Sequence, residues 1–418
     1  MVVVGQGYVG LSVACAAAEA GFTVAGIDVD EERIQALRRG ELVVPGVNAA
    51  TFQSALATGR ISFENDFDPV ASGDVILICV PTPVRDQAPD LSYIEAAAKE
   101  TASRMVPGPL VILESTTYPG TTDELVRPLL ETSGLQVGRD FLLAYSPERI
   151  DPGNDAFTFR SVPRIVGGFT PEAAGVAALF YAQIVDSVVT VSSSRAAELA
   201  KLLENTFRQV NIALVNEMAV LCHELDLDIW EVIEAAASKP FGFMPFHPGP
   251  GVGGHCIPLD PTYLAWLVRR DVGYQFRMVE QAQDINAQMP AWVGTRIGDA
   301  LNEAGKTVKG SNVLVLGVAY KPDVADVRES PALRVMTQLR RRGARVSFHD
   351  PYVNSVEVNG QIVKSVQLSQ RVLADADCVA LLTPHSSYDL EWIAHHGRLV
   401  FDGRNAYGDR PSKNIVRL

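Results

Sequence analysis

The side chain best suited to covalent chemistry is Cys256, which lies in a segment rich in glycine and proline. Residues 246–261 contain four glycines and four prolines, which predicts a fixed loop rather than a regular element. Such a loop offers backbone N–H groups to a phosphate or a nucleotide base. Cys256 stands where this loop meets the next predicted helix, and a thiol near a helix start can act as a nucleophile. Composition alone leaves open whether Cys256 is catalytic or a small structural residue.

Two residues close to Cys256 in the sequence could move protons. Asp260 follows four residues later and lies within reach of the thiol if the segment is helical. His255 is adjacent to the cysteine and could act as a base, but neighbouring residues in an extended segment point apart. We therefore favour a structural or backbone role for His255.

A lysine and an asparagine stand on an otherwise apolar helix further upstream. Lys201 and Asn205 are four residues apart and so share one helical face. Two interpretations stay open, because such polar groups need partners. The pair lies either at a solvated edge or as two donors aimed at a developing oxyanion.

The start of the chain carries a nucleotide-binding pattern. Residues 5–10 read G-x-G-x-x-G between a predicted strand and a predicted helix. In this pattern Gly5 allows the tight turn, Gly7 lets the backbone approach a pyrophosphate, and Gly10 lets the helix pack against the strand. Asp28 closes the next strand, where a carboxylate binds the ribose diol and repels a 2′-phosphate. The pattern therefore favours NAD over NADP, although Arg33 stands close to Asp28 in the sequence.

Alternating strand-like and helix-like runs surround this motif and predict an α/β fold with a parallel sheet covered on both faces. Strands are expected at 2–4, 23–28, 74–80, 110–114 and 141–145, and helices at 11–20 and 31–39. The alternation returns after Lys309, with strands at 312–316, 345–349, 378–383 and 398–401 and a helix at 330–342.

One long helix is expected between these two parts. Residues 198–223 contain no glycine or proline and have apolar positions on more than one side. Such a helix usually lies between domains or subunits, so we expect a homodimer built on it. The fold class is therefore two Rossmann-like, doubly wound parallel-sheet domains joined by a long central helix. The expected domains are 1–193 for NAD, 194–305 for the helices and the cysteine loop, and 306–418 for the nucleotide sugar.

Composition narrows the class of protein. The formal charge of −13 argues against nucleic acid as the main partner. No apolar run reaches the roughly 18 residues of a membrane span, and the chain starts without the basic and hydrophobic stretches of a secretory signal. The five cysteines fit neither a disulfide framework nor a zinc site, so no metal is expected. Cys15, Cys79, Cys222 and Cys378 are expected to be small buried residues in a reducing, cytoplasmic compartment.

With these residues assembled, the chain resembles the UDP-glucose/GDP-mannose dehydrogenase family over essentially its whole length. The motifs that carry the resemblance occur in the family's order. They are residues 5–10, 80–83, 114–122, 146–149, 201–205, 253–256, 317–321, 326–330 and 401–404.

The resemblance implies an NAD-dependent enzyme of polysaccharide biosynthesis that oxidises C6 of a nucleotide-diphosphate sugar to a carboxylate, with two hydride transfers at one site. It implies that Cys256 holds a thiohemiacetal and then a thioester, while Lys201 and Asn205 stabilise the oxyanion. It gives Thr116, Glu148 and Asp260 the positioning of water and the movement of protons. The cofactor-binding residues would be Gly5, Gly7, Tyr8, Val9, Gly10, Asp28, Arg33, Pro81, Thr82, Ser115 and Thr116. The substrate-binding residues would be Glu148, Arg149, Lys201, Asn205, Phe246, Gly249, Gly251, Gly253, Lys321 and Arg404.

The choice of sugar depends on one departure from the family pattern. Glucose-specific members usually carry an arginine upstream of the cysteine loop, whereas residues 239–246 contain none. The resemblance therefore favours UDP-N-acetylglucosamine or UDP-N-acetylmannosamine, with UDP-glucose or dTDP-glucose as the alternative. Two other classes of protein are alternatives to this family. A β-hydroxyacid dehydrogenase of the 6-phosphogluconate type does not account for the Cys256 loop. An NAD-sensing regulator would need a DNA-binding element or another surface that passes on the signal, and the acidic chain shows none.

Overall fold

The computed structural model describes residues 1–85, 88–150, 157–254, 256–410 and 412–418. The chain divides into two compact units. The first unit contains residues 1–204 and 262–273, and the second contains residues 205–261 and 274–418. The expected domain boundaries at residues 193 and 305 stay a prediction.

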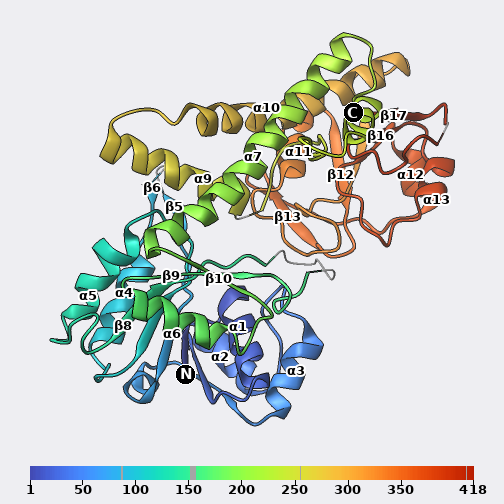
Figure 1. Cartoon of the computed structure of the whole chain (residues 1–418). Helices are drawn as coiled ribbons and strands as arrows, with labels where there is room; N and C mark the ends of the chain where they lie inside the picture. The colour runs from blue at the N-terminus through green and yellow to red at the C-terminus, as the bar shows by residue number, and fades with distance from the viewer. Residues whose placement is uncertain (86–87, 151–156, 255, 411) are drawn as a thin grey trace. The chain divides into compact units, whose positions relative to one another are not determined.

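An eight-stranded sheet forms the centre of the first unit (Figure 1). All neighbouring strands are parallel except β8 and β9, which pair antiparallel. In spatial order the strands are β10 (Val188–Val191), β9 (Arg164–Gly168), β8 (Leu142–Tyr145), β7 (Leu110–Leu113), β4 (Val75–Ile78), β1 (Val2–Val4), β2 (Val24–Ile27) and β3 (Ile61–Glu64).

Each face of this sheet has its own apolar core, because side chains alternate along a strand. In β1, Val3 packs with the helices α1 (Tyr8–Glu19), α2 (Glu31–Arg38), α3 (Ala49–Ala57) and α6 (Pro171–Tyr181). Val2 and Val4 pack on the opposite face with α4 (Ser92–Ala102) and α5 (Arg127–Glu131). Figure 1 shows α1 and α4 on different sides of the sheet. Burial on both faces explains why the central strands read as continuous apolar runs.

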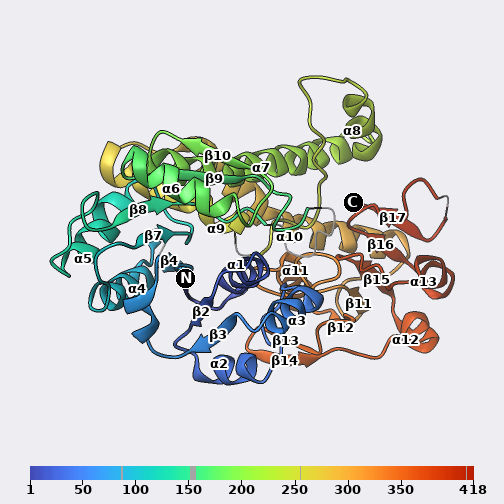
Figure 2. The same ribbon diagram turned by 60° about the horizontal axis from the view of Figure 1, so that its bottom comes forward.

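A second sheet, with all five strands parallel, forms the centre of the second unit. Its spatial order is β12 (Arg345–His349), β11 (Asn312–Leu316), β15 (Cys378–Leu381), β16 (Val400–Asp402) and β17 (Ile415–Arg417). One face is covered by α10 (Arg277–Glu303) and α11 (Pro331–Arg341), and the other by α12 (Gln370–Asp375) and α13 (Leu390–His396). Figure 2 shows these helices around the sheet.

The remaining regular elements are short or connect the sheets. They are the hairpins β5 (Val84–Arg85) with β6 (Ala88–Pro89) and β13 (Ser355–Val358) with β14 (Gln361–Lys364), the α-helices α8 (Ile229–Ala237) and α9 (Cys256–Leu267), the 3-10 helix η1 (Asp68–Ser72), and the π-helices η2 (Thr121–Val126) and η3 (Val268–Val272). None of the helices in the described residues is long and apolar enough to cross a membrane.

The long helix α7 (Ser194–Glu224) confirms the expected central helix and extends it at both ends. It begins in the first unit and ends in the second. The expected fold class, two Rossmann-like domains and a long central helix, is confirmed. The strands expected at 2–4, 312–316 and 345–349 have the predicted bounds.

One strand direction was not predicted, and one local expectation is wrong. The strands expected in the first sheet pair parallel, but β9, which was not expected, runs antiparallel to β8. The segment 246–261 is not a loop throughout, because α9 begins at Cys256 and includes Pro258 and Pro261. Pro258 stands in the first turn, where the N–H has no partner inside the helix, whereas Pro261 lies inside the helix and removes one backbone hydrogen bond. Cys256 is therefore the first residue of a helix.

A buried carboxyl group fixes the start of α7 in the first unit. Glu198 accepts hydrogen bonds from the backbone N–H of Gly120 at 2.6 Å and of Thr122 at 2.9 Å, and from the Thr122 hydroxyl at 2.7 Å. Its side chain is fully buried. Burial raises the pKa of the Glu198 carboxyl to about 7, although the three hydrogen bonds work in the opposite direction.

This raised pKa predicts a pH-dependent stability. The folded protein binds the Glu198 proton more tightly than the unfolded chain does, so the contribution of this group is most favourable below pH 4.5 and declines as the pH rises to about 7. The decline amounts to about 3 kcal/mol. In Glu198→Gln this decline is absent, so the variant gains stability relative to the wild type between pH 5 and pH 8 in thermal unfolding. The exposed Glu100→Gln serves as control, and parallel curves for Glu198→Gln and the wild type would contradict the assignment.

Candidate active site

The turn between β1 and α1 has the geometry of a pyrophosphate site. Gly5 has a φ of 93°, and a Cβ there would lie 2.6 Å from the carbonyl oxygen of Cys79. A Cβ at Gly10 would lie 1.8 Å from the carbonyl oxygen of Gly5, so both positions require glycine. Gly7 has open space where a side chain would stand. It is also the N-cap of α1 and makes no side-chain capping bond, so the helix N-terminus and the open backbone suit an anion.

Asp28 lies at the end of β2, as the sequence predicted, and is already well bonded. One carboxylate oxygen accepts from Gln6 N–H at 2.7 Å and from Arg33 Nη1 at 2.8 Å, and the other accepts from Asp30 N–H at 3.0 Å. Arg33 also pairs with Asp30 at 3.2 Å. A ribose diol at Asp28 would therefore compete with the Arg33 guanidinium. The sequence named both residues but not the ion pair between them.

The loops after β4 and β7 lie together at the carboxyl edge of the first sheet, where ligands of such sheets bind. Ser115 donates its hydroxyl to the carbonyl of Val80 at 2.7 Å, which joins the two loops. Thr82 is buried, and its carbonyl accepts from the hydroxyl of Tyr263 on α9. Thr116 follows Ser115 and is half-buried. The predicted residues Pro81, Thr82, Ser115 and Thr116 therefore belong to one edge.

Glu148 follows β8 and makes hydrogen bonds with both carboxylate oxygens. Oε1 accepts from the backbone N–H of Arg149 at 2.6 Å and of Ile150 at 2.5 Å, and Oε2 accepts from Arg164 at 2.5 Å. Arg149 pairs with Glu204 on α7 at 2.7 Å. Arg164 was missed by the sequence analysis, although a lone arginine at the start of the apolar run Arg164–Gly168 was a usable signal.

Lys201 and Asn205 lie on the buried side of α7, with exposed fractions of 8% and 5%. This rules out the solvated-edge interpretation. Asn205 donates its amide N–H to Asp260 on α9 at 2.5 Å, one turn after Cys256. Within the described ranges, Lys201 has no ion-pair partner.

Cys256 is exposed, whereas the other four cysteines are buried as predicted, and none of the five forms a disulfide. The backbone N–H of Gly254, two residues earlier, donates to the carbonyl of Arg328 at 3.0 Å. The Arg328 guanidinium pairs with Asp326 at 2.6 Å, and this carboxylate raises the pKa of Arg328. His255 lies outside the described residues.

The glycines of the cysteine loop pack against the predicted substrate residues of the second unit. A Cβ at Gly249 would lie 2.4 Å from Nη1 of Arg404, and one at Gly253 would lie 2.8 Å from Tyr320, the neighbour of Lys321. Burial lowers the pKa of Arg404 to about 10, so it stays cationic at neutral pH. No carboxylate pairs with its side chain among the residues that the structure describes, which suits a diphosphate.

Two buried asparagines hold this loop and were not predicted. Asn216 on α7 accepts from Gly249 N–H at 3.0 Å and donates to Asn286 on α10 at 2.8 Å. Gly251 also lies against Asn286, because a Cβ there would be 3.1 Å from its carbonyl oxygen. Phe246 packs edge-on against Phe207 of α7 at 5.7 Å between ring centroids. The signal for the asparagines was a polar residue on an apolar helix.

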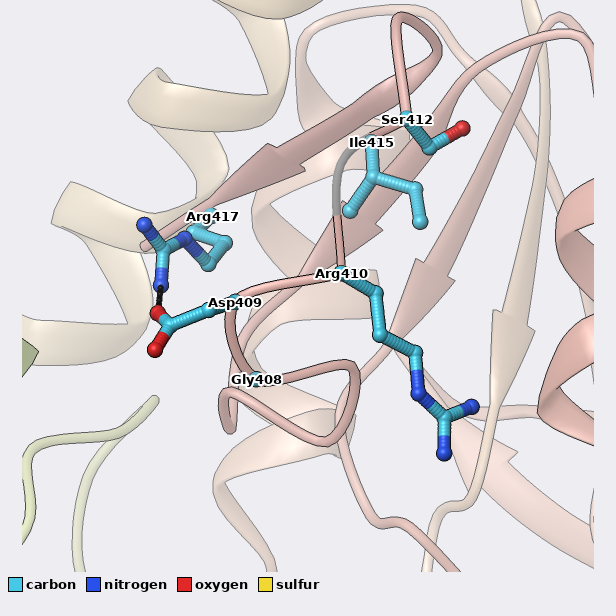
Figure 3. Close-up of a pocket in the computed structure, with 6 residues that line it drawn as sticks. All are labelled: Gly408, Asp409, Arg410, Ser412, Ile415 and Arg417. Atoms are coloured by element: carbon cyan, nitrogen blue, oxygen red, sulfur yellow. Dashed lines mark hydrogen bonds and ion pairs between the residues drawn. The ribbon is translucent and has the colours of Figure 1, made fainter.

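A surface pocket beside β17 contains none of these residues. It is lined by Gly408, Asp409, Arg410, Ser412, Ile415 and Arg417. Figure 3 shows the Arg417–Asp409 ion pair, with the Arg410 side chain extending away from it. Arg417 also pairs with Asp228, so two carboxylates balance its charge. We do not place the chemistry in this pocket.

Three domain models of the UDP-glucose/GDP-mannose dehydrogenase family match the chain in order. The NAD-binding domain matches residues 1–185, the central domain matches residues 195–288, and the UDP-binding domain matches residues 314–409.

Individual relatives are similar over nearly the whole chain. A UDP-N-acetyl-D-mannosamine dehydrogenase of Pyrococcus horikoshii is 34% identical over 99% of this chain and 97% of its own length. A solved structure of the UDP-D-ManNAc dehydrogenase of that organism covers 100% of this chain and 97% of its own, with a TM-score of 0.89. A solved UDP-glucose dehydrogenase of Pyrobaculum islandicum is 30% identical, covers 99% and 96% of the two chains, and has a TM-score of 0.85.

The position of Asp28 predicts the choice of cofactor. A 2′-phosphate beside this carboxylate would lose a hydrogen bond and meet a like charge, so kcat/KM should be higher for NAD⁺ than for NADP⁺. In Asp28→Asn the charge is gone, and the ratio of the two kcat/KM values should fall by about tenfold, the effect of roughly 1.4 kcal/mol. Asp30→Asn, which also contacts Arg33, should keep the wild-type ratio. Equal wild-type values for the two cofactors would defeat this role of Asp28.

Proposed function

This chain belongs to the UDP-glucose/GDP-mannose dehydrogenase family, and we propose that it oxidises C6 of a UDP-N-acetylhexosamine to the carboxylate in two steps at one site. It is an NAD-dependent nucleotide-sugar dehydrogenase. The observation that best supports this mechanism is the Asn205–Asp260 hydrogen bond. It joins α7, on the side where Lys201 and Asn205 lie, to the helix that begins at Cys256.

The first part of the mechanism concerns Cys256. NAD⁺ accepts a hydride from C6 in each step, so two NAD⁺ are consumed for each sugar. Cys256 attacks the C6 aldehyde and keeps it covalently bound while the cofactor is exchanged. Lys201 and Asn205 are one turn apart on α7 and supply a cation and an amide donor to the oxyanion of the thiohemiacetal. Their burial strengthens this interaction, because little water competes with it.

The second part releases the acid. Oxidation of the thiohemiacetal gives a thioester, which water cleaves. Thr116 and Glu148 in the first unit and Asp260 in the second are the proposed groups that place the water and move its protons. Asp260 is buried to 1% exposure and bonded to Asn205, so its position is fixed relative to α7. Arg404, with Lys321 beside Tyr320, is the proposed partner of the diphosphate.

The sugar is proposed from two observations. The relative of Pyrococcus horikoshii is named for UDP-N-acetyl-D-mannosamine, and residues 239–246 lack the arginine usual in glucose-specific members. Phe241 and Met244 in this segment are 70% and 61% exposed, so the chain places apolar groups there. We therefore propose UDP-N-acetylmannosamine or its C2 epimer UDP-N-acetylglucosamine. UDP-glucose stays the alternative, because the similar Pyrobaculum protein is a UDP-glucose dehydrogenase. None of the five cysteines forms a disulfide, which favours a reducing, cytoplasmic location.

The proposed function is tested by counting NADH for each sugar across a panel of UDP sugars. Both UDP-N-acetylhexosamines should be used with higher kcat/KM than UDP-glucose, and the preferred one should give two NADH and a charged product. Cys256→Ser should lower turnover by about 10³-fold or more, the scale of losing a nucleophile, because a hydroxyl attacks less well and an ester hydrolyses more slowly.

The buried cysteines provide matched controls. Cys222→Ala and Cys378→Ala should keep the ratio of NADH to sugar, whatever their effect on stability. A wild-type ratio of one with an aldehyde product contradicts the mechanism, and so does a Cys256→Ala variant that makes acid at the wild-type rate. A higher kcat/KM for UDP-glucose contradicts only the choice of sugar.

We also propose that two copies of the chain form a dimer through α7. One side of this helix is buried, and the opposite side exposes an apolar stripe at intervals of four and seven residues. Its members are Leu199, Leu203, Phe207, Leu214 and Leu221, which are 44% to 64% exposed. A contiguous apolar stripe of this length is typical of a surface that is covered in solution, and a two-fold axis would bring the same stripe of both copies together.

The dimer predicts a mass of twice the 45.1 kDa chain in light scattering at micromolar concentration. The double variant Leu203→Glu with Leu214→Glu should be monomeric, because it would bury charges in the contact. Leu179→Glu, on α6 and 70% exposed, is the matched control and should stay dimeric. A fully active wild-type monomer would refute this assembly.

A further inference from the structure

We propose that Arg164 is a positioning residue that turns the Glu148 carboxylate toward the water that hydrolyses the thioester. This inference rests on the proposed function, because it assigns Arg164 to the hydrolysis step of that mechanism. Arg164 and the side chains that it contacts all lie within the first unit. Arg164 itself contacts no reacting atom in this proposal and acts only through Glu148.

Arg164 is placed where it can bridge two strands. It is the first residue of β9, and its guanidinium reaches carboxylates that follow β7 and β8. Nη1 donates to Glu148 at 2.5 Å, and Nη2 makes an ion-pair contact with Glu114 at 2.6 Å without hydrogen-bond geometry. Nε donates to the Ser146 hydroxyl at 3.1 Å. Each of the three nitrogens therefore has a fixed direction.

Packing holds the guanidinium plane in place. Arg164 is 3% exposed, and its Cζ lies 5.6 Å from the ring centroid of Phe159 and 5.0 Å from that of Tyr181. Tyr181 also donates its hydroxyl to the other oxygen of Glu114. Burial alone would lower the pKa of Arg164, but Glu114 and Glu148 raise it well above its usual value. The group is therefore a permanent cation in a rigid setting.

The contacts of Glu148 leave one direction open. A carboxylate has about four acceptor positions. Among the described residues, Arg149 N–H and Ile150 N–H take two on Oε1, and Arg164 takes one on Oε2. The remaining position is on Oε2, the oxygen that Arg164 holds. The arginine therefore decides which way the free lone pair of Glu148 points.

In the proposed mechanism, this oxygen takes part in the release of the acid product. The water oxygen forms a bond to the thioester carbonyl carbon, and the water proton passes to the open position on Oε2 of Glu148. The C–S bond then breaks, and Cys256 leaves as the thiolate. The proton later returns to solvent, so the step needs no oxidant or reductant. Without Arg164 the carboxylate can rotate, and its free lone pair no longer has a single direction.

The proposed role of Arg164 requires the planar set of donors of a guanidinium group and not only its positive charge. A lysine would keep a cation but could not hold Glu148, Glu114 and Ser146 at fixed angles, because it lacks the planar arrangement of donors. Arg164→Lys is therefore the sharpest variant. Ser146→Ala is the milder one, since it leaves the arginine in place and removes only a hydroxyl, which accepts from Nε and also contacts the Tyr181 side chain.

The experiment is pre-steady-state NADH formation with NAD⁺ and UDP-N-acetylmannosamine, or the sugar preferred in the panel, followed by intact-protein mass spectrometry. In Arg164→Lys the two NADH of the first turnover should form at near the wild-type rate, and kcat should fall by at least about tenfold. KM for the sugar should fall with kcat, because a slower final step lets the acyl-enzyme accumulate. That acyl-enzyme should appear as a mass increase on Cys256.

The comparison variants separate positioning from general damage. Glu148→Gln should accumulate the same acyl-enzyme. The double variant Glu148→Gln with Arg164→Lys should be no slower than Glu148→Gln alone, because both substitutions remove the same function. Ser146→Ala should change kcat in the same direction by a smaller factor. Arg38→Lys, which alters a guanidinium bonded to Phe63 and Glu64, should match the wild type.

Each outcome decides the question. An Arg164→Lys variant that slows both hydride steps as much as turnover, or that accumulates no acyl-enzyme, overturns the proposal. If the Arg164 variants do not fold, Ser146→Ala decides instead. A wild-type kcat and a wild-type amount of acyl-enzyme in Ser146→Ala would overturn the proposal. A wild-type ratio of one NADH for each sugar overturns the proposed function itself, and this is known before any variant is measured.

Discussion

The hydrogen bond from Asn205 to Asp260 is the contact that joins α7 to the first turns of α9, where Cys256 lies. A buried amide and a buried carboxylate each lose water on folding, and leaving either one without a partner costs about 1–3 kcal/mol or more. Pairing them at 2.5 Å fixes α9 against α7 at one point. Because Cys256 begins α9 and Asp260 follows one turn later, this point also sets the place of the thiol relative to Asn205.

The same requirement explains how α7 organises the glycine-rich loop of the second unit. Asn216 is fully buried, so its amide must be satisfied inside the protein, and it bonds both Gly249 and Asn286. The glycines then allow the backbone to approach Arg404 and Tyr320 more closely than any side chain would permit. Polar groups on a mostly apolar helix thus hold a segment that has little regular structure of its own.

The sequence predicted the parts that local patterns determine. The strands around Val3 and Leu314 are buried on both faces, so their apolar runs were unambiguous, and the turn at Gly5 was identified from its glycine spacing. The direction of β9 was not predicted, because strand direction depends on the path of the chain and not on the strand's own residues. A helix was expected to follow the loop at Cys256, but its first residues, up to Pro261, were assigned to the loop because of their composition. The contacts of Arg164 and Asn216 are long-range, and residue types alone do not specify them.

The position of the unit boundary on α7 has a consequence for the spacing of two polar residues. The two compact units divide between Glu204 and Asn205, and α7 continues through that division as one helix. Lys201 is assigned to one unit and Asn205 to the other, yet one helical turn sets their separation along the helix axis at about 6 Å. This rise is a property of the helical backbone and does not depend on the placement of the rest of either unit. Only unwinding of α7 at this turn would change it.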